Sequence, residues 1–221
     1  MNKSFDTTWE DIHKTQEWGK YPSEDIIRFI ARNYYKEERS NIKILDFGCG
    51  AGANTWYLAR EGFDTFAFDG SDSAISKAKS YLEKDNLEAH FEVADALDIS
   101  YPNEFFDCII DSAVVYANTI KNITDMYKKI YDLLVLGGKL FSTGLFTPNT
   151  TGYGTGLSLE KNTFKDLREG ALSGRGTVHF FEKEEVLELL NAARFHHINI
   201  DMVRRTDKDN IVEYWMASAE K

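Results

Sequence analysis

Residues 42–52 read IKILDFGCGAG, an apolar run that leads directly into three closely spaced glycines. The apolar residues 42–47 predict a buried strand, and residues 53–61 (ANTWYLARE) predict the helix that follows it. Glycines between a strand and a helix permit a tight turn and let a ligand approach the backbone. The stretch therefore predicts a strand–loop–helix unit that holds a ligand at its glycines.

The alternation of strands and helices continues along the chain. Further strands are expected at residues 64–69, 90–95, 105–114 and 139–146, and further helices at 23–37, 71–85, 121–138 and 182–195. Two last strands, 197–205 and 210–220, flank a short turn and predict an antiparallel hairpin. We therefore expect an α/β fold with a Rossmann-like, doubly wound, mostly parallel seven-stranded sheet and a C-terminal antiparallel hairpin.

The chain of 221 residues is expected to form a single domain over residues 1–221. Residues 1–40 form a polar leader that contains tryptophan, and we expect it to be a helical lid. Residues 147–181 break the strand–helix rhythm and are rich in glycine. This segment predicts an insertion with mobile loops before the last helix.

The net charge of −10 argues against a nucleic-acid partner, because such binding usually depends on clustered Lys and Arg. No apolar run approaches the roughly 20 residues that span a bilayer, and residues 1–18 lack a signal-peptide pattern. Cys49 and Cys108 have no metal-ligand spacing, so no metal is predicted. A soluble, cytoplasmic protein without a membrane partner is the expectation.

An acidic residue, Asp69, ends the second strand 19 residues after Gly50. A carboxylate at that place can accept hydrogen bonds from two ribose hydroxyls, so the pair predicts a nucleoside-bearing cofactor. NAD and FAD sites carry G-x-G-x-x-G, whereas this chain has G-x-G-x-G and Ala53 after it. Asp46, two residues before the first glycine, would repel a pyrophosphate and attract a cationic ligand.

Five motifs in this order resemble those of class I S-adenosylmethionine-dependent methyltransferases. They are ILDFGCGAG, FAFDGS, VADALDIS, FFDCIIDSAVVY and LLVLGGKLF. The resemblance covers about residues 42–145 and the terminal hairpin. It implies S-adenosyl-L-methionine as cofactor and S-adenosyl-L-homocysteine as product. Gly48, Gly50 and Gly52 would line the methionine moiety, with Asp46 near its ammonium group.

The same resemblance implies contacts to the adenosine part of the cofactor. Asp69 would hold the ribose, and Gly70 and Ser71 would lie beside the adenine. Asp95 would accept a hydrogen bond from the adenine amino group, and Ala96 would add a backbone contact. The alternative for Asp69 and Asp95 is that they only cap helices or turns.

Candidates for contact with the acceptor follow the fourth strand. The resemblance places Asp111 and Ser112 at the sulfonium and the acceptor. Tyr116 could contact either ligand, or it could serve packing alone. His179 is a candidate base for an acceptor that must lose a proton, or else a residue bonded to backbone at the entry of the last helix.

Aromatic residues of the leader and the insertion are candidates for a lid or for substrate contact. They are Trp9, Trp18 and Tyr21 in the leader and Tyr153 in the insertion. Arg168 and Arg175 in the insertion could meet a carboxylate or phosphate of the substrate. The alternatives are an amphipathic helix against the sheet edge and a solvated loop with ordinary surface charge.

The expected function is S-adenosylmethionine-dependent methyl transfer to oxygen or nitrogen of a small-molecule acceptor. The sequence DSAVVY does not resemble the Asn/Asp-Pro-Pro-Tyr/Phe motif of enzymes that methylate exocyclic amines of bases. A non-catalytic module that only binds the cofactor, a protein or tRNA methyltransferase, and an NAD-dependent oxidoreductase remain as alternatives. The acceptor and the oligomeric state stay open.

Overall fold

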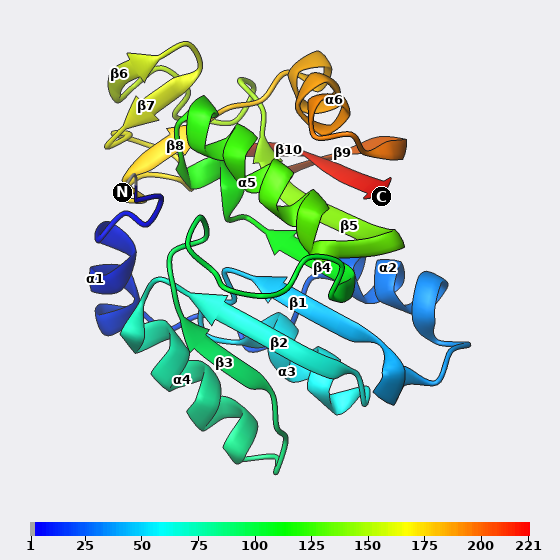
Figure 1. Cartoon of the computed structure of the whole chain (residues 1–221). Coiled ribbons are helices and arrows are strands. Elements are labelled where there is room, and N and C mark those ends of the chain that lie inside the picture. The colour runs from blue at the N-terminus through cyan, green and yellow to red at the C-terminus, as the bar shows by residue number, and fades with distance from the viewer. Residues whose placement is uncertain (1–2) are drawn as a thin grey trace.

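The computed structural model describes residues 3–221, and its centre is a seven-stranded sheet in the order β3-β2-β1-β4-β5-β10-β9 (Figure 1). The strands are β1 (Lys43–Phe47), β2 (Asp64–Asp69), β3 (His90–Val93), β4 (Phe106–Ser112), β5 (Leu134–Phe146), β9 (His196–Asp207) and β10 (Asn210–Glu220). Strands β3, β2, β1, β4 and β5 pair in parallel, and β10 pairs antiparallel with both β5 and β9. The predicted fold class is confirmed.

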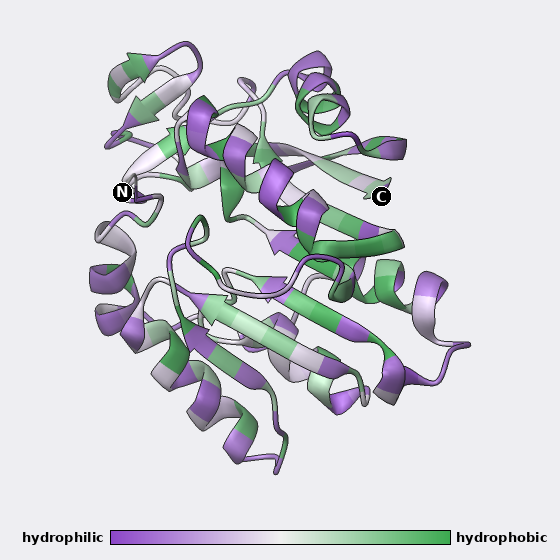
Figure 2. Ribbon diagram, viewed as in Figure 1, coloured by the Kyte–Doolittle hydropathy of each residue, from purple (hydrophilic) through white to green (hydrophobic). Residues whose placement is uncertain are grey.

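Helices cover both faces of this sheet. They are α2 (Glu24–Tyr34), α3 (Ala53–Arg60), α4 (Asp72–Glu83), α5 (Ile120–Leu133) and α6 (Lys183–Ala192). Successive residues of β1 point to opposite faces. Ile44 packs in one core with α2 and α3, whereas Leu45 and Phe47 pack in another with α5 and α6. Figure 2 shows the central strands as largely hydrophobic, as expected of parallel strands buried on both faces.

The leader contains two helices with different surroundings. Helix α2 buries Ile26 and Ile30 completely in the core beneath β1 and β4, so it belongs to the body of the domain. The shorter α1 (Thr8–Thr15) packs on α4, at the end of the sheet where the parallel strands finish. Only the part of the leader before α2 therefore has a lid's location.

The insertion is more regular than expected. It forms a second sheet in the order β6-β7-β8, with both pairings antiparallel, from β6 (Leu157–Glu160), β7 (Thr163–Lys165) and β8 (Thr177–His179). Glycines with positive φ, among them Gly170 and Gly174, lie in the connections. The glycines thus make turns between short strands rather than a set of open loops.

The boundary between α5 and β5 also differs from the expectation. The helix ends at Leu133 and the strand begins at Leu134, so the expected helix of residues 121–138 is shorter. The amide of Gly137 donates to the carbonyl of Lys221, and the amide of Lys221 donates to the carbonyl of Gly138. Backbone pairing of residues 137–138 with Lys221 thus takes the place of a last helical turn. Gly137 has φ +78°, which lies outside the helical region, and glycine disfavours helix. Among residues 3–221, no helix is long and apolar enough to cross a membrane.

Candidate functional site

A pocket of about 950 Å³ lies at the carboxyl ends of β1, β2 and β4. Ligands of doubly wound sheets bind at this edge, and the volume lies at the upper end of the range for ligand sites. One wall consists of loops that leave the strands, with Gly48, Gly50, Asp69, Gly70 and Ser112. A second part of the lining, here called the roof, comes from leader residues between Ser4 and Pro22 and from Ala171, Leu172 and Arg175 of the insertion.

The glycine loop combines ligand access with close packing. Gly50 has φ +52° and lines the pocket, where a Cβ atom would lie 3.4 Å from Cε1 of His13. A Cβ on Gly48 would lie 2.7 Å from the methyl groups of Val114, so the loop also passes close to the end of β4. Gly52 does not line the pocket. Its missing side chain lets α3 approach α4, because a Cβ there would lie 2.7 Å from that of Ala78.

Asp69 joins the glycine loop to the start of α4. Its Oδ2 accepts from the amide of Gly50 at 2.9 Å, and its Oδ1 accepts from the amide of Ser71 at 2.9 Å. Burial raises the pKa of Asp69, and the bonds from Ser71 and Gly50 partly offset that rise. Each carboxylate oxygen accepts up to about two hydrogen bonds, so this pocket-lining residue retains capacity for a ligand's hydroxyls.

Asp46 lies behind the loop and does not line the pocket. Its fully buried carboxylate accepts from Thr55 Oγ1 at 2.6 Å and from Asn54 Nδ2 at 3.2 Å. Burial raises the pKa of Asp46 to about 6. Its side chain fixes the first turn of α3, and Asn54 stands between it and the pocket as a lining residue.

Asp95 binds the beginning of the leader. Its Oδ2 accepts from the amides of Ser4 at 2.7 Å and Phe5 at 2.9 Å. Its Oδ1 accepts from Ser4 Oγ at 2.5 Å and from the amide of Leu97 at 3.0 Å. Four donors fill the usual capacity of a carboxylate. An adenine amino group at Asp95 would therefore have to replace one of the leader's donors.

The leader also covers the next residues of the expected adenine site. A methyl group built on Gly70 would collide with the ring of Phe5. Ala96 lines the pocket, as expected of a residue with a backbone contact to the ligand. Ser71 is buried outside the pocket lining, where its hydroxyl caps α4 by accepting from the amide of Ala74 at 3.0 Å.

A second anchor fixes α1 to the start of α4. Glu10 accepts from the hydroxyl of Ser71, and from that of Ser73 at 2.8 Å. The hydrogen bond from Ser71 is the main reason why the pKa of Glu10 falls to about 2. The roof is thus tied to the sheet at Asp95 and at Glu10.

Asp111 is buried below the pocket, whereas Ser112 lines it. Asp111 Oδ1 accepts from the amides of Val114 at 3.0 Å and Val115 at 3.3 Å, and its Oδ2 accepts from the hydroxyl of Ser142. Burial raises the pKa of Asp111 to about 6. Its contacts shape the turn after β4, and the structure gives it no surface in the pocket.

Tyr116 lines the pocket and is only 3% exposed. Its ring packs edge-to-face on Phe146 with centroids 4.9 Å apart. Burial raises the pKa of Tyr116 well above its usual range, so the residue stays a neutral hydroxyl. It can donate or accept a hydrogen bond but cannot act as an ionised base at neutral pH.

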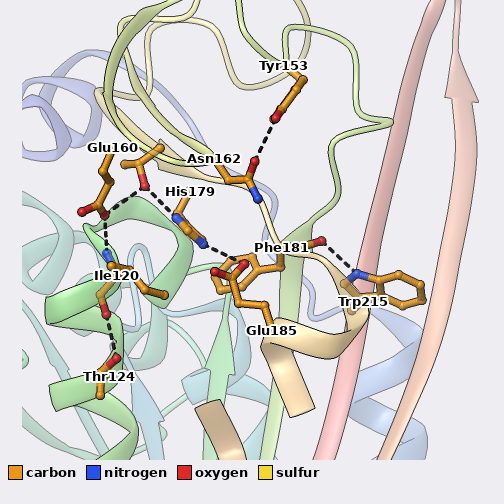
Figure 3. A network of polar contacts seen from close by, with 10 residues as sticks. Ile120, Thr124, Tyr153, Glu160, Asn162, His179, Phe181, Glu185 and Trp215 are labelled. Atoms are coloured by element: carbon orange, nitrogen blue, oxygen red, sulfur yellow. Dashed lines mark hydrogen bonds and ion pairs between the residues drawn. The ribbon is translucent and has the colours of Figure 1, made fainter. Parts of the chain in front are cut away.

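His179 lies outside the pocket lining, in a polar network beneath the insertion (Figure 3). Its Nδ1 contacts Thr163 Oγ1 at 2.7 Å, and its Nε2 contacts Glu185 Oε2 at 3.2 Å. Both ring nitrogens are partnered, which fits a role in holding β7, β8 and α6 together. Tyr153 also lies outside the lining and donates to Asn162 Oδ1 at 2.8 Å.

The roof presents Trp9, Trp18 and Tyr21 to the pocket, as the leader's sequence suggests. It also presents Arg175, one of the two insertion arginines that the sequence suggests for an acidic group of the substrate, and His13, which was not among the expected site residues. The other arginine, Arg168, is exposed and lies outside the pocket lining. His13 follows Trp9 by four residues in α1, so helical spacing placed both on one face. No local pattern indicates which of the two arginines reaches the pocket, because the roof residues around Arg175 are distant from it in the sequence.

Among residues 3–221, one group of side chains of metal-ligand type lies elsewhere. His196, His197 and Glu220 bring ligand atoms within 4.8 Å of one another on β9 and β10. Both histidines are exposed, and none of the three residues lines the pocket.

Comparisons with known proteins agree with this architecture. Residues 44–138 match a family described as "Methyltransferase domain". Phosphoethanolamine N-methyltransferase 3 of Arabidopsis thaliana is 36% identical over 107 residues, which cover 46% of this chain and 20% of that protein. Ubiquinone biosynthesis O-methyltransferase of Pelagibacter ubique is 28% identical over 122 residues, or 55% of this chain and 50% of the relative.

A solved structure of similar fold comes from Methanosarcina mazei and is titled a SAM-dependent methyltransferase. It has a TM-score of 0.69 at 20% identity and covers 86% of this chain and 96% of the other. The chain spans between a fifth and a half of the length of the two curated relatives. Residues 44–138 therefore match a methyltransferase domain, and the chain as a whole shares the fold of solved S-adenosylmethionine-dependent methyltransferases, one of which holds S-adenosyl-L-methionine.

Proposed function

We propose that the protein transfers a methyl group from S-adenosylmethionine to oxygen or nitrogen of a small-molecule acceptor. The observation that carries this proposal is the pocket in which the glycine loop and Asp69 lie opposite an aromatic roof. Gly48 and Gly50 line the pocket with bare backbone, and Asp69 presents a buried carboxylate at the end of β2.

The residues present fit the cofactor. Asp69 can accept from ribose hydroxyls, Ala96 can offer its backbone to the adenine, and Gly50 leaves room for the methionine moiety. When bound, S-adenosylmethionine supplies a methyl group that is already activated for transfer. The remaining work of the protein is to position the acceptor and to exclude water, which can be worth several kcal/mol. Tyr116 and Ser112 supply hydroxyls at the pocket surface for that positioning.

A small acceptor is favoured by the roof. Leader and insertion cover the pocket from the side opposite the strands, which restricts access for a folded macromolecule. The net charge of −10 disfavours nucleic acid. Among the curated relatives, phosphoethanolamine N-methyltransferase and ubiquinone biosynthesis O-methyltransferase are named for small acceptors.

The leader before α2 is proposed to act as a lid. It rests on Asp95 through Ser4 and Phe5, and on α4 through Glu10. The Ser4–Phe5 contact lies where the adenine is expected, so that anchor would open or shift when the cofactor binds. The contact through Glu10 lies outside the pocket and would hold α1 in place meanwhile.

Methyl transfer is tested with S-adenosylmethionine labelled in its methyl group. The purified protein is incubated with a panel of hydroxyl- and amine-bearing metabolites, and the label is followed into the small-molecule fraction. We expect label in at least one acceptor and an equal amount of S-adenosylhomocysteine. Binding of the cofactor without transfer to any member would instead favour the non-catalytic module.

A further inference from the structure

We propose that Arg175, Trp18 and His13 form a subsite for an acidic group, a carboxylate or phosphate, on the acceptor. This inference rests on the proposed function and assigns a chemical class to the acceptor of the same site.

Within residues 3–221, three buried side-chain atoms have no such partner. They are Nδ1 of His13, Nε1 of Trp18 and Nη1 of Arg175. All three residues line the pocket, and all belong to the roof. A buried polar group without a partner costs about 1–3 kcal/mol, so three of them at one pocket point to a binding site for a group that accepts hydrogen bonds.

Aromatic rings hold the guanidinium of Arg175 in place. Its Cζ lies 4.6 Å from the ring centroid of Trp18 and 5.7 Å from that of Trp9. In the described part of the chain, no carboxylate pairs with this arginine within 4.0 Å. A positive charge fixed at a pocket and left unpaired, in a chain of net charge −10, is suited to an anion.

His13 adds a third nitrogen to this group. The ring is 4% exposed and lies 5.6 Å from the ring of Trp18. Burial lowers the pKa of His13, and nearby Arg175 lowers it further although Asp69 opposes the shift. The neutral ring can donate from Nδ1 in one tautomer.

These three side chains supply donors of one kind. The Trp18 indole and the Arg175 guanidinium can only donate hydrogen bonds, and His13 can donate as well. A group with several acceptor oxygens and a negative charge satisfies all three together. A neutral amide or alcohol would leave at least the positive charge uncompensated.

The cofactor carries a carboxylate of its own, so two sources of the acidic group must be separated. His13 lies close to Gly50, where the methionine moiety is expected. Arg175, however, belongs to the insertion and lines the same pocket as Tyr116, where its positive charge opposes the rise that burial causes in the pKa of Tyr116. Tyr116 follows β4, on the side expected for the acceptor, and we therefore assign the subsite to the acceptor.

The probes for the test are benzoate, phenyl phosphate and the neutral benzamide. Their binding is titrated to the full-length protein, with and without S-adenosylhomocysteine, by calorimetry or by tryptophan fluorescence. We expect at least one acidic probe to bind ten times more tightly than benzamide. Arg175→Met should abolish that preference, and Trp18→Phe should reduce it about threefold. Arg168→Met, an exposed arginine of the same insertion outside the pocket, is the matched control and should retain it.

The cofactor's carboxylate is tested in a second arm with S-adenosylhomocysteine and methylthioadenosine, which lacks that carboxylate. If Arg175→Met weakens S-adenosylhomocysteine tenfold and leaves methylthioadenosine unchanged, the subsite serves the cofactor and the acceptor assignment is wrong. Equal binding of acidic and neutral probes, or a preference that survives Arg175→Met, also overturns the proposal. Wild-type protein that prefers the acidic probes but binds no S-adenosylhomocysteine refutes the proposed function and leaves the acid subsite standing.

Discussion

The sheet side and the roof of the pocket differ in whether their buried polar groups have hydrogen-bond partners. On the sheet side, Asp46, Asp69 and Asp111 are all buried, and each accepts hydrogen bonds from nearby residues of the domain. In the roof, His13, Trp18 and Arg175 carry buried nitrogens without partners. The carboxylates of the sheet side are held by hydrogen bonds within the domain, and of the three only Asp69 lines the pocket, which suits a preformed site for the cofactor. The roof is incomplete, which suits the recognition of a particular acceptor.

The largest expected effect is a loss of stability from disturbed packing between α3 and α4, behind the glycine loop. Gly52→Ala places a methyl group 2.7 Å from Cβ of Ala78 and forces alanine to φ +86°. Overpacking and backbone strain together should lower the free energy of unfolding by about 2–4 kcal/mol. Urea denaturation measures this loss.

Gly62→Ala is the control for backbone strain alone. Gly62 has φ +87°, and a Cβ there meets nothing within 4 Å. It should cost only about 1–2 kcal/mol. Equal losses for the two variants would show that the contact between α3 and α4 at Gly52 is not tight.

The next effect concerns cofactor affinity. Asp69→Ala removes the acceptor of two backbone amides and the expected ribose ligand, so S-adenosylhomocysteine should bind about 1–3 kcal/mol more weakly. Calorimetry measures the change. Asp64→Ala, at the other end of the same strand and outside the pocket, should leave the affinity unchanged. If both variants bind like the wild type, Asp69 does not hold the cofactor.

A third prediction concerns the pH dependence of stability. Burial raises the pKa of Asp111 from its ordinary 3.8 to about 6. As the pH rises from about 4 to about 6, the unfolded chain loses this proton first, so the free energy of unfolding falls over that interval. Between pH 4 and pH 7 the wild type should therefore lose roughly 1–3 kcal/mol of unfolding free energy that Asp111→Asn does not lose. Urea denaturation of both proteins at the two pH values measures this difference. Asp46, with its pKa also raised to about 6, remains in both proteins and cancels in the difference.

The same pair of measurements also tests whether the carboxylate of Asp111 is buried. If wild type and Asp111→Asn differ by the same free energy at both pH values, Asp111 has the same pKa in folded and unfolded chains. The carboxylate would then be in contact with water in the pocket rather than buried under the turn after β4.

The smallest expected effect concerns the leader. Ser4→Ala removes one of four donors from Asp95. If adenine competes with Ser4 there, S-adenosylhomocysteine should bind up to about fivefold more tightly, as expected for one hydrogen bond. Ser100 is an exposed serine in the connection between β3 and β4, which also carries Asp95, and Ser100→Ala should leave the affinity unchanged. Unchanged or weaker binding by Ser4→Ala would mean that the leader's anchor and the adenine do not compete.

The sequence predicted the sheet side of the molecule well and the roof only in part, since Trp9, Trp18, Tyr21 and Arg175 line the pocket whereas Tyr153 does not. The succession of strands and helices along the chain and the position of Asp69 at the end of β2 follow from local patterns, because hydrophobic runs and glycines are contiguous in the chain. The contacts of Asp46 and Asp111 were not predictable, since burial under a turn depends on packing. Arg175 meets Trp18 only after insertion and leader have folded onto the same pocket, and no local pattern indicates that contact.

Calorimetric titration of the purified protein with S-adenosylmethionine, S-adenosylhomocysteine and NADH tests most directly which cofactor the pocket binds. We expect the first two to bind and NADH not to bind, because the glycine loop and Asp69 form a site for an adenosyl cofactor without a pyrophosphate. Binding of NADH alone would contradict this account of the pocket.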